Sequence, residues 1–332
     1  MATNRLLRRA LSAFNHTSHR WVPIPPSNTQ PQMTRTLPPT PPSLPPRSNG
    51  TTSTPKPTLS LVSWNIDAPS PRPIARAKLI LSHILEAPKP PDIIFLQEVT
   101  PGVRDSLHGD ARVRGTFLVT DAEDRASFKN VPFATITLLS SARFASGVDE
   151  QKEGGGIKER GRLTPGCVSR VALPSKYGRD ALSVDIRTAD TLLRLINVHL
   201  DSLGDTLHYR TQQMGILANI LGEPGCGGGI IAGDFNVISP EDDALVGENG
   251  LVDAWAALHG TAANGGGATW GVDRKLPEGL APGRLDKVAM LSVTAEEVEV
   301  LRPDFIEVPR PAKEPLSIPW SDHCGLRCTF TI

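Results

Sequence analysis

Acidic residues are missing from the first 58 positions of the chain, which hold six Arg and one Lys. Because the formal charge of the whole chain is zero, residues 59–332 must carry a net charge of −7. An acidic body argues against a broad surface for duplex DNA, since the phosphate backbone is bound by clusters of Lys and Arg. Contact with nucleic acid is therefore expected only along a local strip.

Cysteine and long apolar runs are also scarce. The four cysteines, Cys167, Cys226, Cys324 and Cys328, are scattered, which favours reduced thiols over a disulfide framework. No apolar run reaches the ~18 residues of a membrane-spanning helix, so no membrane span is expected. The 332 residues suffice for one large domain or two small ones.

The N-terminal part of the chain differs in composition from the rest. Residues 1–20 are rich in Arg, and Leu7, Leu11 and Phe14 fall on one face of a helix. This pattern is typical of a mitochondrial presequence, and a disordered basic tail is an equal alternative. Residues 21–57 are crowded with Pro, Ser and Thr, which predicts an extended, disordered linker. The folded domain is therefore expected to comprise residues 58–332.

Two periodicities alternate within that domain. Apolar residues recur at helical spacing in residues 73–85 and 205–221. Short apolar runs typical of strands occupy residues 59–64, 92–97, 116–120, 134–139, 167–173, 181–186, 192–198, 285–291 and 325–332. The Gly-rich, charged residues 147–162 predict a mobile loop. Helices and strands interleave without the regular alternation of a barrel, which indicates an α/β fold with more than one sheet.

The most informative stretch is residues 229–236, an apolar run that ends in Gly233-Asp234-Phe235-Asn236. Ile230 and its neighbours predict a short buried strand, and two residues that are two positions apart project to the same side. Asp234 and Asn236 therefore become neighbours in a candidate site. Taken alone, an ordinary Asp/Asn turn is the better interpretation.

Other strand-like runs also end in polar groups, and this repetition changes the interpretation. Asn65 and Asp67 follow the run at residues 59–64, Glu98 follows the run at 92–97, and His199 and Asp201 follow the run at 192–198. Ser321-Asp322-His323 precedes the last run, at residues 325–332. Acids, amides and histidines bind metals or phosphate, and strand ends in layered α/β folds are common places for such sites.

The ordered set of motifs resembles the endonuclease/exonuclease/phosphatase superfamily, and within it is most similar to the 5'-tyrosyl-DNA phosphodiesterases. The segments that carry the resemblance are Ser63-Trp64-Asn65-Ile66-Asp67, Leu96-Gln97-Glu98-Val99, His199-Leu200-Asp201-Ser202, Gly233-Asp234-Phe235-Asn236, Ala268-Thr269-Trp270, Arg284-Leu285-Asp286-Lys287 and Ser321-Asp322-His323. The resemblance covers residues 58–332 and implies a four-layer sandwich of two mixed β-sheets flanked by helices.

The resemblance also implies a metal centre. Hard carboxylate and amide oxygens are the ligands that Mg²⁺ prefers. Glu98, at the end of a buried strand, is the expected direct ligand, and Asp322 and Asn65 complete the shell or hold its waters. One Mg²⁺ is the expected cofactor, and Mn²⁺ is an expected substitute.

The remaining motif residues receive catalytic roles from the same resemblance. Asp234 matches the group that orients and deprotonates the attacking water, and Asn236 matches an amide donor to the phosphate. His323, as a cation, contacts a phosphate oxygen, and Asp286 matches the aspartate that orients this imidazole. A surface ion pair with Arg284 or Lys287 is the alternative for Asp286. His199 is a second phosphate contact, the acid for the leaving group, or a structural histidine.

Four residues are expected to contact the substrate: Asn65, Ser202, Arg179 and Trp270. A solvated surface position is an equal alternative for Arg179, and a core position is the alternative for Trp270. The chain departs from the family after Ser202, where Leu203-Gly204-Asp205 replaces a segment that carries a positive charge.

The expected activity is Mg²⁺-dependent hydrolysis of a 5'-phosphotyrosyl bond in DNA, within the repair of topoisomerase–DNA adducts. The expected partner is DNA with a 5'-linked tyrosyl or peptide adduct at a single-stranded end, and the protein is expected to be a monomer. Alternatives on the same core are an abasic-site endonuclease or exonuclease, a deadenylase, or a hydrolase of phospholipids or inositol phosphates. A third possibility is that the chain is not an enzyme but a binding protein that recruits partners through its Pro-rich segment. The family implies the nucleus, whereas residues 1–20 fit mitochondrial import.

Overall fold

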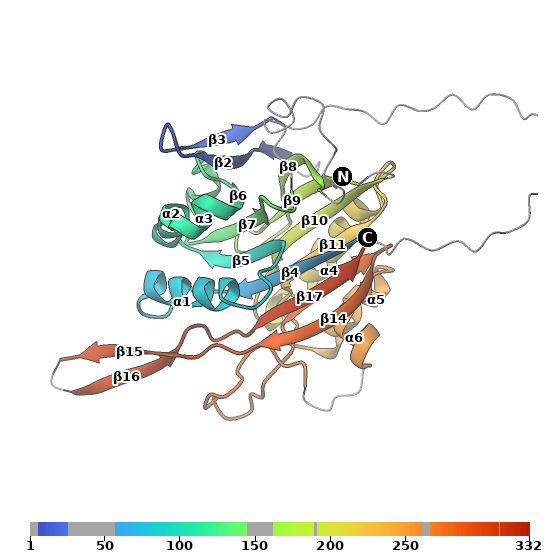
Figure 1. The fold of residues 1–332 in the computed structure, drawn as a ribbon. Helices are drawn as coiled ribbons and strands as arrows, with labels where there is room; N and C mark the ends of the chain where they lie inside the picture. Colours follow the sequence, from blue (N-terminus) through green and yellow to red (C-terminus); the bar gives the residue numbers. More distant parts are fainter. Residues whose placement is uncertain (1–5, 26–56, 145–161, 189–190, 261–265, 312) are drawn as a thin grey trace, which may run out of the picture.

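The computed structural model describes residues 6–25, 57–144, 162–188, 191–260, 266–311 and 313–332. Two β-sheets face one another in this part of the chain, and helices cover their outer faces (Figure 1). Apolar side chains such as Phe95, Leu195 and Ile230 fill the space between the sheets. The expected four-layer sandwich is confirmed.

The described residues form one seven-stranded and one eight-stranded sheet. The seven-stranded sheet has, in spatial order, β1 (Leu6–Arg9), β8 (Thr164–Ala172), β9 (Asp180–Arg187), β10 (Leu192–His199), β11 (Gly229–Asp234), β13 (Asp286–Leu291) and β12 (Val252–Asp253). The eight-stranded sheet has β14 (Thr294–Leu301), β17 (Gly325–Thr331), β4 (Thr58–Asn65), β5 (Ile93–Val99), β7 (Ala134–Ser140), β6 (Phe117–Thr120), β2 (Leu11–Asn15) and β3 (Arg20–Ile24).

Each outer layer contains a helix that the sequence predicts. Helix α1 (Pro73–Leu85) buries Ile80 and Ile84 against the eight-stranded sheet. Helix α4 (Leu207–Leu221) buries Met214 and Leu217 against the seven-stranded sheet. The predicted helix at residues 205–221 begins with a short 3₁₀ turn, Gly204–Thr206. The other helices are α2 (Pro101–Gly109), α3 (Ala111–Thr116), α5 (Pro240–Glu248) and α6 (Ala254–His259).

The helix predicted for residues 1–20 is wrong, because the described part of this segment forms β-strands. Strand β1 pairs with β8 of one sheet, and β2 pairs with β6 of the other and with β3. Leu11 and Trp21 are only 3% and 8% exposed, so burial against the sandwich outweighs the weak helical pattern. The folded body therefore includes residues 6–24, and not only residues 58–332.

Parts of two other predictions lie outside the described residues. The Pro-rich linker was predicted for residues 21–57, but residues 21–24 belong to β3 and residues 26–56 are not described. The predicted loop at 147–162 is described only at its last residue. Whether residues 1–20 also act as a targeting signal stays a prediction.

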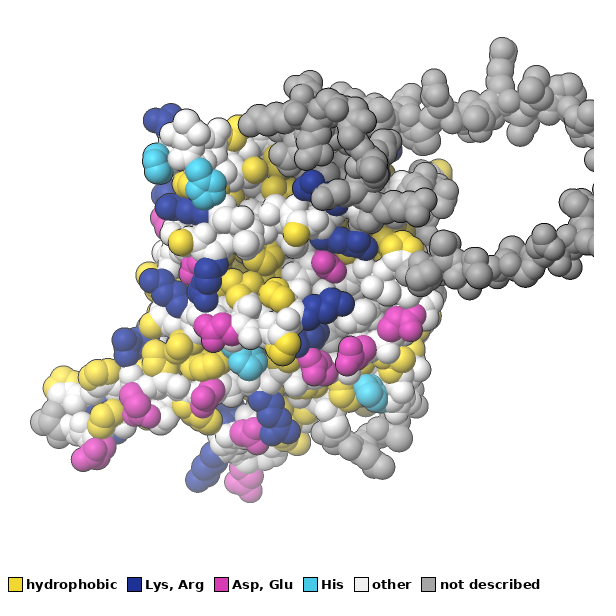
Figure 2. Space-filling model, viewed as in Figure 1, with side chains coloured by type: hydrophobic (Ala, Val, Ile, Leu, Met, Phe, Trp, Pro, Cys, Tyr) yellow, Lys and Arg dark blue, Asp and Glu magenta, His cyan; other side chains and the backbone are white. Residues whose placement is uncertain are grey.

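A two-stranded hairpin, β15 (Phe305–Arg310) and β16 (Lys313–Pro319), projects from the body as an arm beyond α1 (Figure 1). Apolar side chains lie along this arm with charged side chains between them (Figure 2). Its base is fixed by a hydrogen bond from the Trp320 backbone N–H to the carbonyl of Asp304, 2.8 Å. Within the described residues, no helix is both long and apolar enough to cross a membrane.

Candidate active site

The polar residues that follow the strands meet at one edge of the sandwich because of the strand register. In the seven-stranded sheet, His199 at the end of β10 pairs with Asp234 at the end of β11. Asp234 in turn pairs with Asp286 at the start of β13. These three residues therefore lie side by side on adjacent strands. The close approach of β11 to β10 requires Gly233, because a Cβ at this position would lie 2.0 Å from the carbonyl oxygen of Val198.

Glu98 enters the site from the opposite sheet through an irregularity in β5. The register between β5 and β7 shifts between Leu96 and Val99, and Glu98 has a φ of 58°, in the left-handed region. Its Oε2 accepts a 2.8 Å hydrogen bond from the backbone N–H of Ala68. Burial raises the pKa of the Glu98 carboxyl above its ordinary value, although the hydrogen bonds from Ala68 and Asn65 oppose this shift.

Asn65 joins the carboxylates of the two sheets. Its Nδ2 donates to Asp234 Oδ2 at 3.0 Å and to Glu98 Oε1 at 3.3 Å. Its Oδ1 accepts from the backbone N–H of Asp67 at 3.0 Å. In this orientation Asn65 is a donor to both acids. Of its two predicted roles, completing the metal shell with its oxygen requires the amide to turn over, whereas holding a water of the shell does not.

Asp234 is buried at the centre of the cluster. Its Oδ1 accepts from the backbone N–H of Asn236 at 2.8 Å, which fixes the carboxylate. Burial raises the pKa of Asp234 to about 7, and the neighbouring His323 cation limits this rise. Asn236 Nδ2 donates one hydrogen to the carbonyl of Leu200 at 3.0 Å, so its second hydrogen remains for another acceptor.

The predicted histidine–aspartate pair is present. His323 Nδ1 lies 2.8 Å from Asp286 Oδ2, and its Nε2 lies 3.8 Å from Asp234 Oδ2. Burial alone would lower the pKa of His323, but the two carboxylates outweigh burial and hold the pKa well above the ordinary value. The ring is therefore cationic at neutral pH.

The alternative of a surface ion pair for Asp286 is wrong. Asp286 is buried, and the two basic residues near it in sequence have other partners. Lys287 Nζ contacts the carboxylates of Asp243 and Asp253, and Arg284 contacts the same two residues. Asp286 is thus left to orient His323, and its own catalytic role stays a prediction.

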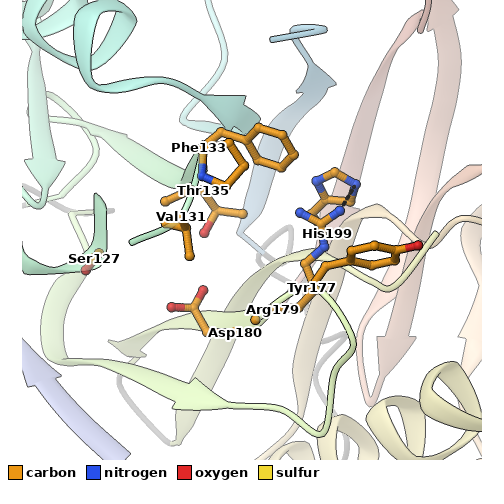
Figure 3. A pocket seen from close by; sticks show the side chains of 11 residues that line it. Ser127, Val131, Phe133, Thr135, Tyr177, Arg179, Asp180 and His199 are labelled. Atoms are coloured by element: carbon orange, nitrogen blue, oxygen red, sulfur yellow. Dashed lines mark hydrogen bonds between the residues drawn. The ribbon is translucent and has the colours of Figure 1, made fainter. Parts of the chain in front are cut away.

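His199 occupies the far side of Asp234, at the end of a pocket (Figure 3). Its Nε2 lies 3.4 Å from Asp234 Oδ2 and 3.3 Å from Arg179 Nη2. Burial, reinforced by the Arg179 cation, lowers the pKa of His199 well below its ordinary value, so the imidazole is neutral at pH 7. The ring stacks on Phe133 with a centroid distance of 5.6 Å. No motif in the sequence indicates this role for Phe133.

The pocket beside His199 has aromatic walls and a cationic group. The Arg179 guanidinium lies 5.1 Å from the ring centroid of Phe133 and 5.6 Å from that of Tyr177. Figure 3 shows these side chains around one space, with Asp180 and Ser127 farther from His199. The predicted substrate contact Arg179 is thus half-buried and packed against His199 and Phe133, so it is not the fully solvated side chain of the alternative.

Asp322, Trp270 and Ser202 complete the predicted set. Asp322 Oδ2 accepts from Trp270 Nε1 at 3.1 Å and lies 3.6 Å from Arg274 Nη1. Trp270 therefore holds a predicted metal ligand in place. Ser202 is half-buried, and the contact found for it is its carbonyl accepting from the Thr206 hydroxyl. Asp67 and Asp201, which also follow strands, serve to fix loops.

The donor set fits a divalent cation. Four carboxylates lie close enough to influence one another or His323 electrostatically: Glu98, Asp234, Asp286 and Asp322. Burial lowers the pKa of the neighbouring Arg76 and Arg179. Oδ1 of Asp286 has no hydrogen-bond partner within the described residues. Asp234, Asp286 and His323 also have potential ligand atoms within 4.8 Å of one another. Because His323 is committed to Asp286, Glu98 and Asp322 stay the predicted ligands of the cation.

Replacement of Asp286 by Asn tests its assigned role. We expect kcat to fall about 10- to 100-fold, because the loss of an orienting carboxylate has effects of this size. The free energy of unfolding should change much less, which thermal unfolding would measure. Asp253→Asn, which removes a carboxylate from the neighbouring ion pairs, is the matched control. Equal kcat losses in the two variants would argue against a specific role for Asp286.

Comparison with known proteins agrees with this geometry. The model of the Endonuclease/Exonuclease/phosphatase family matches residues 62–323. Among solved structures, that of D. rerio TDP2 complexed with single strand DNA product is similar over 83% of this chain and 99% of its own, with 22% identity and a TM-score of 0.60.

Two further structures share the fold. That of C. elegans TDP2 has 21% identity and a TM-score of 0.56, over 83% of this chain and 75% of its own. That of the human Nocturnin catalytic domain with bound sulfate anion has 18% identity and a TM-score of 0.55, over 83% of this chain and 93% of its own. At these identities the likeness shows the fold alone. None of the curated proteins matches this chain in sequence.

Proposed function

The chain belongs to the endonuclease/exonuclease/phosphatase family and is a metal-dependent phosphoesterase, and from this premise we propose that it hydrolyses a 5'-phosphotyrosyl bond in DNA. We propose Mg²⁺ as its metal, because oxygen ligands such as those of Glu98 and Asp322 suit this ion. DNA repair after failed topoisomerase reactions is the proposed context, with a single-stranded DNA end as the partner and a monomeric protein.

The observation that carries this proposal is the pocket beside His199. Its walls are the rings of Phe133 and Tyr177, its cation is Arg179, and its inner end adjoins Asp234. A phosphate ester of a phenol presents an anion next to an aromatic ring, which is the chemistry that this combination recognises. The structural likeness to D. rerio TDP2 complexed with single strand DNA product supports the same substrate class.

The residues divide the reaction between them. Asp234, with its pKa raised to about 7, holds and deprotonates a water for attack on phosphorus. The cationic His323 and the free hydrogen of Asn236 stabilise charge on the phosphate oxygens. Neutral His199 accepts a hydrogen bond from Arg179 Nη2 and so orients this guanidinium toward the phosphate, and it does not act as a cationic acid. A bound divalent cation supplies further charge neutralisation at the phosphate.

A substrate panel with the full chain tests the proposal. We expect release of tyrosine from 5'-phosphotyrosyl single-stranded DNA with Mg²⁺ or Mn²⁺, and no release with a chelator. Arg179→Met is the informative variant, because it removes the pocket cation while keeping an apolar side chain, and it should raise KM several-fold. No tyrosine release, together with turnover of another phosphoester, would remove the substrate claim while leaving the phosphoesterase assignment intact.

One observation favours a second candidate, a phosphoesterase that acts on a smaller substrate. On the exposed segment after Ser202, Asp205 forms a 2.6 Å ion pair with Lys176. This pair neutralises the positive charge of Lys176, next to the pocket residue Tyr177. A long DNA strand would bind more tightly if that charge were free, because its phosphates are attracted to Lys and Arg. On the face drawn in Figure 2, acidic and basic side chains are interspersed. The panel should therefore include an inositol phosphate as the small substrate, with a ribonucleotide oligomer and an abasic-site duplex as the chain-like substrates for comparison.

For localisation, we propose the nucleus, with the mitochondrion as the alternative. Because residues 6–24 form strands of the body, removal of a presequence that includes them would take away part of the fold. A fluorescent reporter joined to the C-terminus of the full chain distinguishes the two compartments.

A further inference from the structure

The catalytic groups are divided between two sheets that share no strand. Asn65 and Glu98 stand on the eight-stranded sheet, whereas His199, Asp234 and Asp286 stand on the seven-stranded sheet. Apolar side chains fill much of the space between the sheets, and the buried Arg170 of β8 also crosses it, to Asp121 and to Thr135 of β7. Apolar contacts are not directional, so they do not by themselves fix the distance between the two halves of the site.

A pair of buried amides crosses this space directly beneath the site. Gln97 Nε2 donates to Asn197 Oδ1 at 2.9 Å and to the Ser63 hydroxyl at 3.1 Å. Asn197 Nδ2 donates to the carbonyl of Ile136 at 2.9 Å and to that of Leu96 at 3.4 Å. Both amide side chains are fully buried. The pair thus links β10 of one sheet to β5 and β7 of the other.

Each amide lies next to a catalytic residue along the chain. Gln97 immediately precedes Glu98, and both fall within the register shift of β5. Asn197 precedes His199 by two positions on β10, so the two side chains lie on the same face of that strand. The carbonyls of Leu96 and Ile136, which Asn197 contacts, belong to the last regular pair before the shift. Asn197 therefore holds the place where β5 turns Glu98 into the site.

The pair is not an obvious source of stability. Oε1 of Gln97 has no hydrogen-bond partner within the described residues, and an unsatisfied buried polar atom destabilises the folded state. Apolar side chains of similar volume would fill the same space at lower cost. Buried polar side chains that do not stabilise the fold are found mainly at functional sites, so a role of this pair in catalysis is the simpler explanation.

We propose that Gln97 and Asn197 are positioning residues that set the separation between Glu98 and the His199–Asp234 row. Neither side chain reaches the site itself, since both are fully buried and hydrogen-bonded within the sandwich. They act through the strands. The hydrogen bonds between them hold the register shift of β5, which carries Glu98, against the end of β10, which carries His199. A misplacement of about 1 Å between reacting groups can cost about 100-fold in rate, so a small slip of one sheet over the other is sufficient.

The test uses the variants Gln97→Met, Asn197→Val and their combination in the full chain. The substrate is bis(p-nitrophenyl) phosphate, which makes no use of DNA contacts, so this test is independent of the tyrosyl-DNA proposal. We expect Gln97→Met to lower kcat about 10- to 100-fold with KM changed less than about 3-fold. Asn197→Val should lower kcat at least as much, because it removes the contact with Gln97 and the bonds to Leu96 and Ile136. The double variant should lose little more than Asn197→Val, because that change already breaks the whole link.

The matched control is Ser60→Ala. This change removes a polar link, from the Ser60 hydroxyl to Asp92 Oδ2 at 3.1 Å, at the opposite end of β4 and β5. It should leave kcat unchanged. Losses of kcat that add up in the double variant, a Gln97→Met variant with the original kcat, or an equal loss in Ser60→Ala would each overturn the proposal. Thermal unfolding of Gln97→Met should show a melting temperature close to that of the unmodified chain.

Discussion

Replacement of Asp234 by Asn is expected to lower kcat by a factor of about 10² to 10⁴, the usual range for removal of a general base. Asn keeps the shape of the side chain and accepts a hydrogen bond from the backbone N–H of Asn236, so the loop keeps its conformation. What is lost is the group that takes a proton from the attacking water. KM should change little, because substrate contacts from Arg179 and His323 remain.

The same substitution should not destabilise the fold. Burial raises the pKa of Asp234 to about 7 from an ordinary value of 3.8, so ionisation of this group above pH 7 opposes folding. Asn removes that charge. In the presence of chelator at pH 8, the melting temperature of the variant should therefore equal or exceed that of the unmodified chain.

A matched control is available at the far end of the sandwich. Asp92 is also an aspartate that accepts hydrogen bonds from backbone and hydroxyl groups, but it lies away from the site and contacts Ser60. Asp92→Asn should keep full activity. If Asp234→Asn retained more than a tenth of the original kcat, Asp234 would not be the base.

Deletion of residues 2–25 is expected to produce the largest loss of stability. Leu11, Trp21 and Ile24 are nearly fully buried, and each contributes about 1.5–3 kcal/mol. The Trp21 indole N–H also donates to the carbonyl of His108 at 3.2 Å. A loss of about 5 kcal/mol corresponds to a decrease in melting temperature of about 10 °C or more in a domain of this size. Differential scanning calorimetry measures it.

The deletion would also expose the edges of β6 and β8, and unpaired edges promote aggregation. Deletion of residues 2–5 alone is the control, because the described contacts begin at Leu6. The control should melt as the full chain does. An unchanged melting temperature after loss of residues 2–25 would show that β1, β2 and β3 do not stabilise the body.

The sequence predicts those site residues that directly follow a strand. Asp234 and His199 follow clear apolar runs, and parallel pairing of β10 with β11 brings such ends together. The position of Glu98 was predicted, but not the way it enters the site. A register shift and a left-handed φ decide its direction, and no local pattern in Leu96-Gln97-Glu98-Val99 reports them. Phe133 was missed because only the tertiary structure places it against His199.

Two misjudged elements show different limits. Helix α5 was overlooked although its signal is local, since Ser239 and Asp242 form a capping box. In the N-terminal segment, the helical spacing of Leu7, Leu11 and Phe14 favours a presequence helix and the composition fits a disordered tail equally well, whereas the structure has strands. Its partners β6 and β8 lie more than a hundred residues away along the chain, so its strand conformation is decided by contacts that a local window does not contain.

The place of β17 in the eight-stranded sheet has a consequence for biosynthesis. This strand lies between β14 and β4, and its Leu326 pairs with Ser63, more than 260 positions earlier. Until β17 has left the ribosome, β4 has no neighbour on that side, and the loop that carries Asp322 and His323 has no anchor. Such distant pairing slows folding. The reactive centre therefore forms only after β17 has been synthesised and has paired with β4.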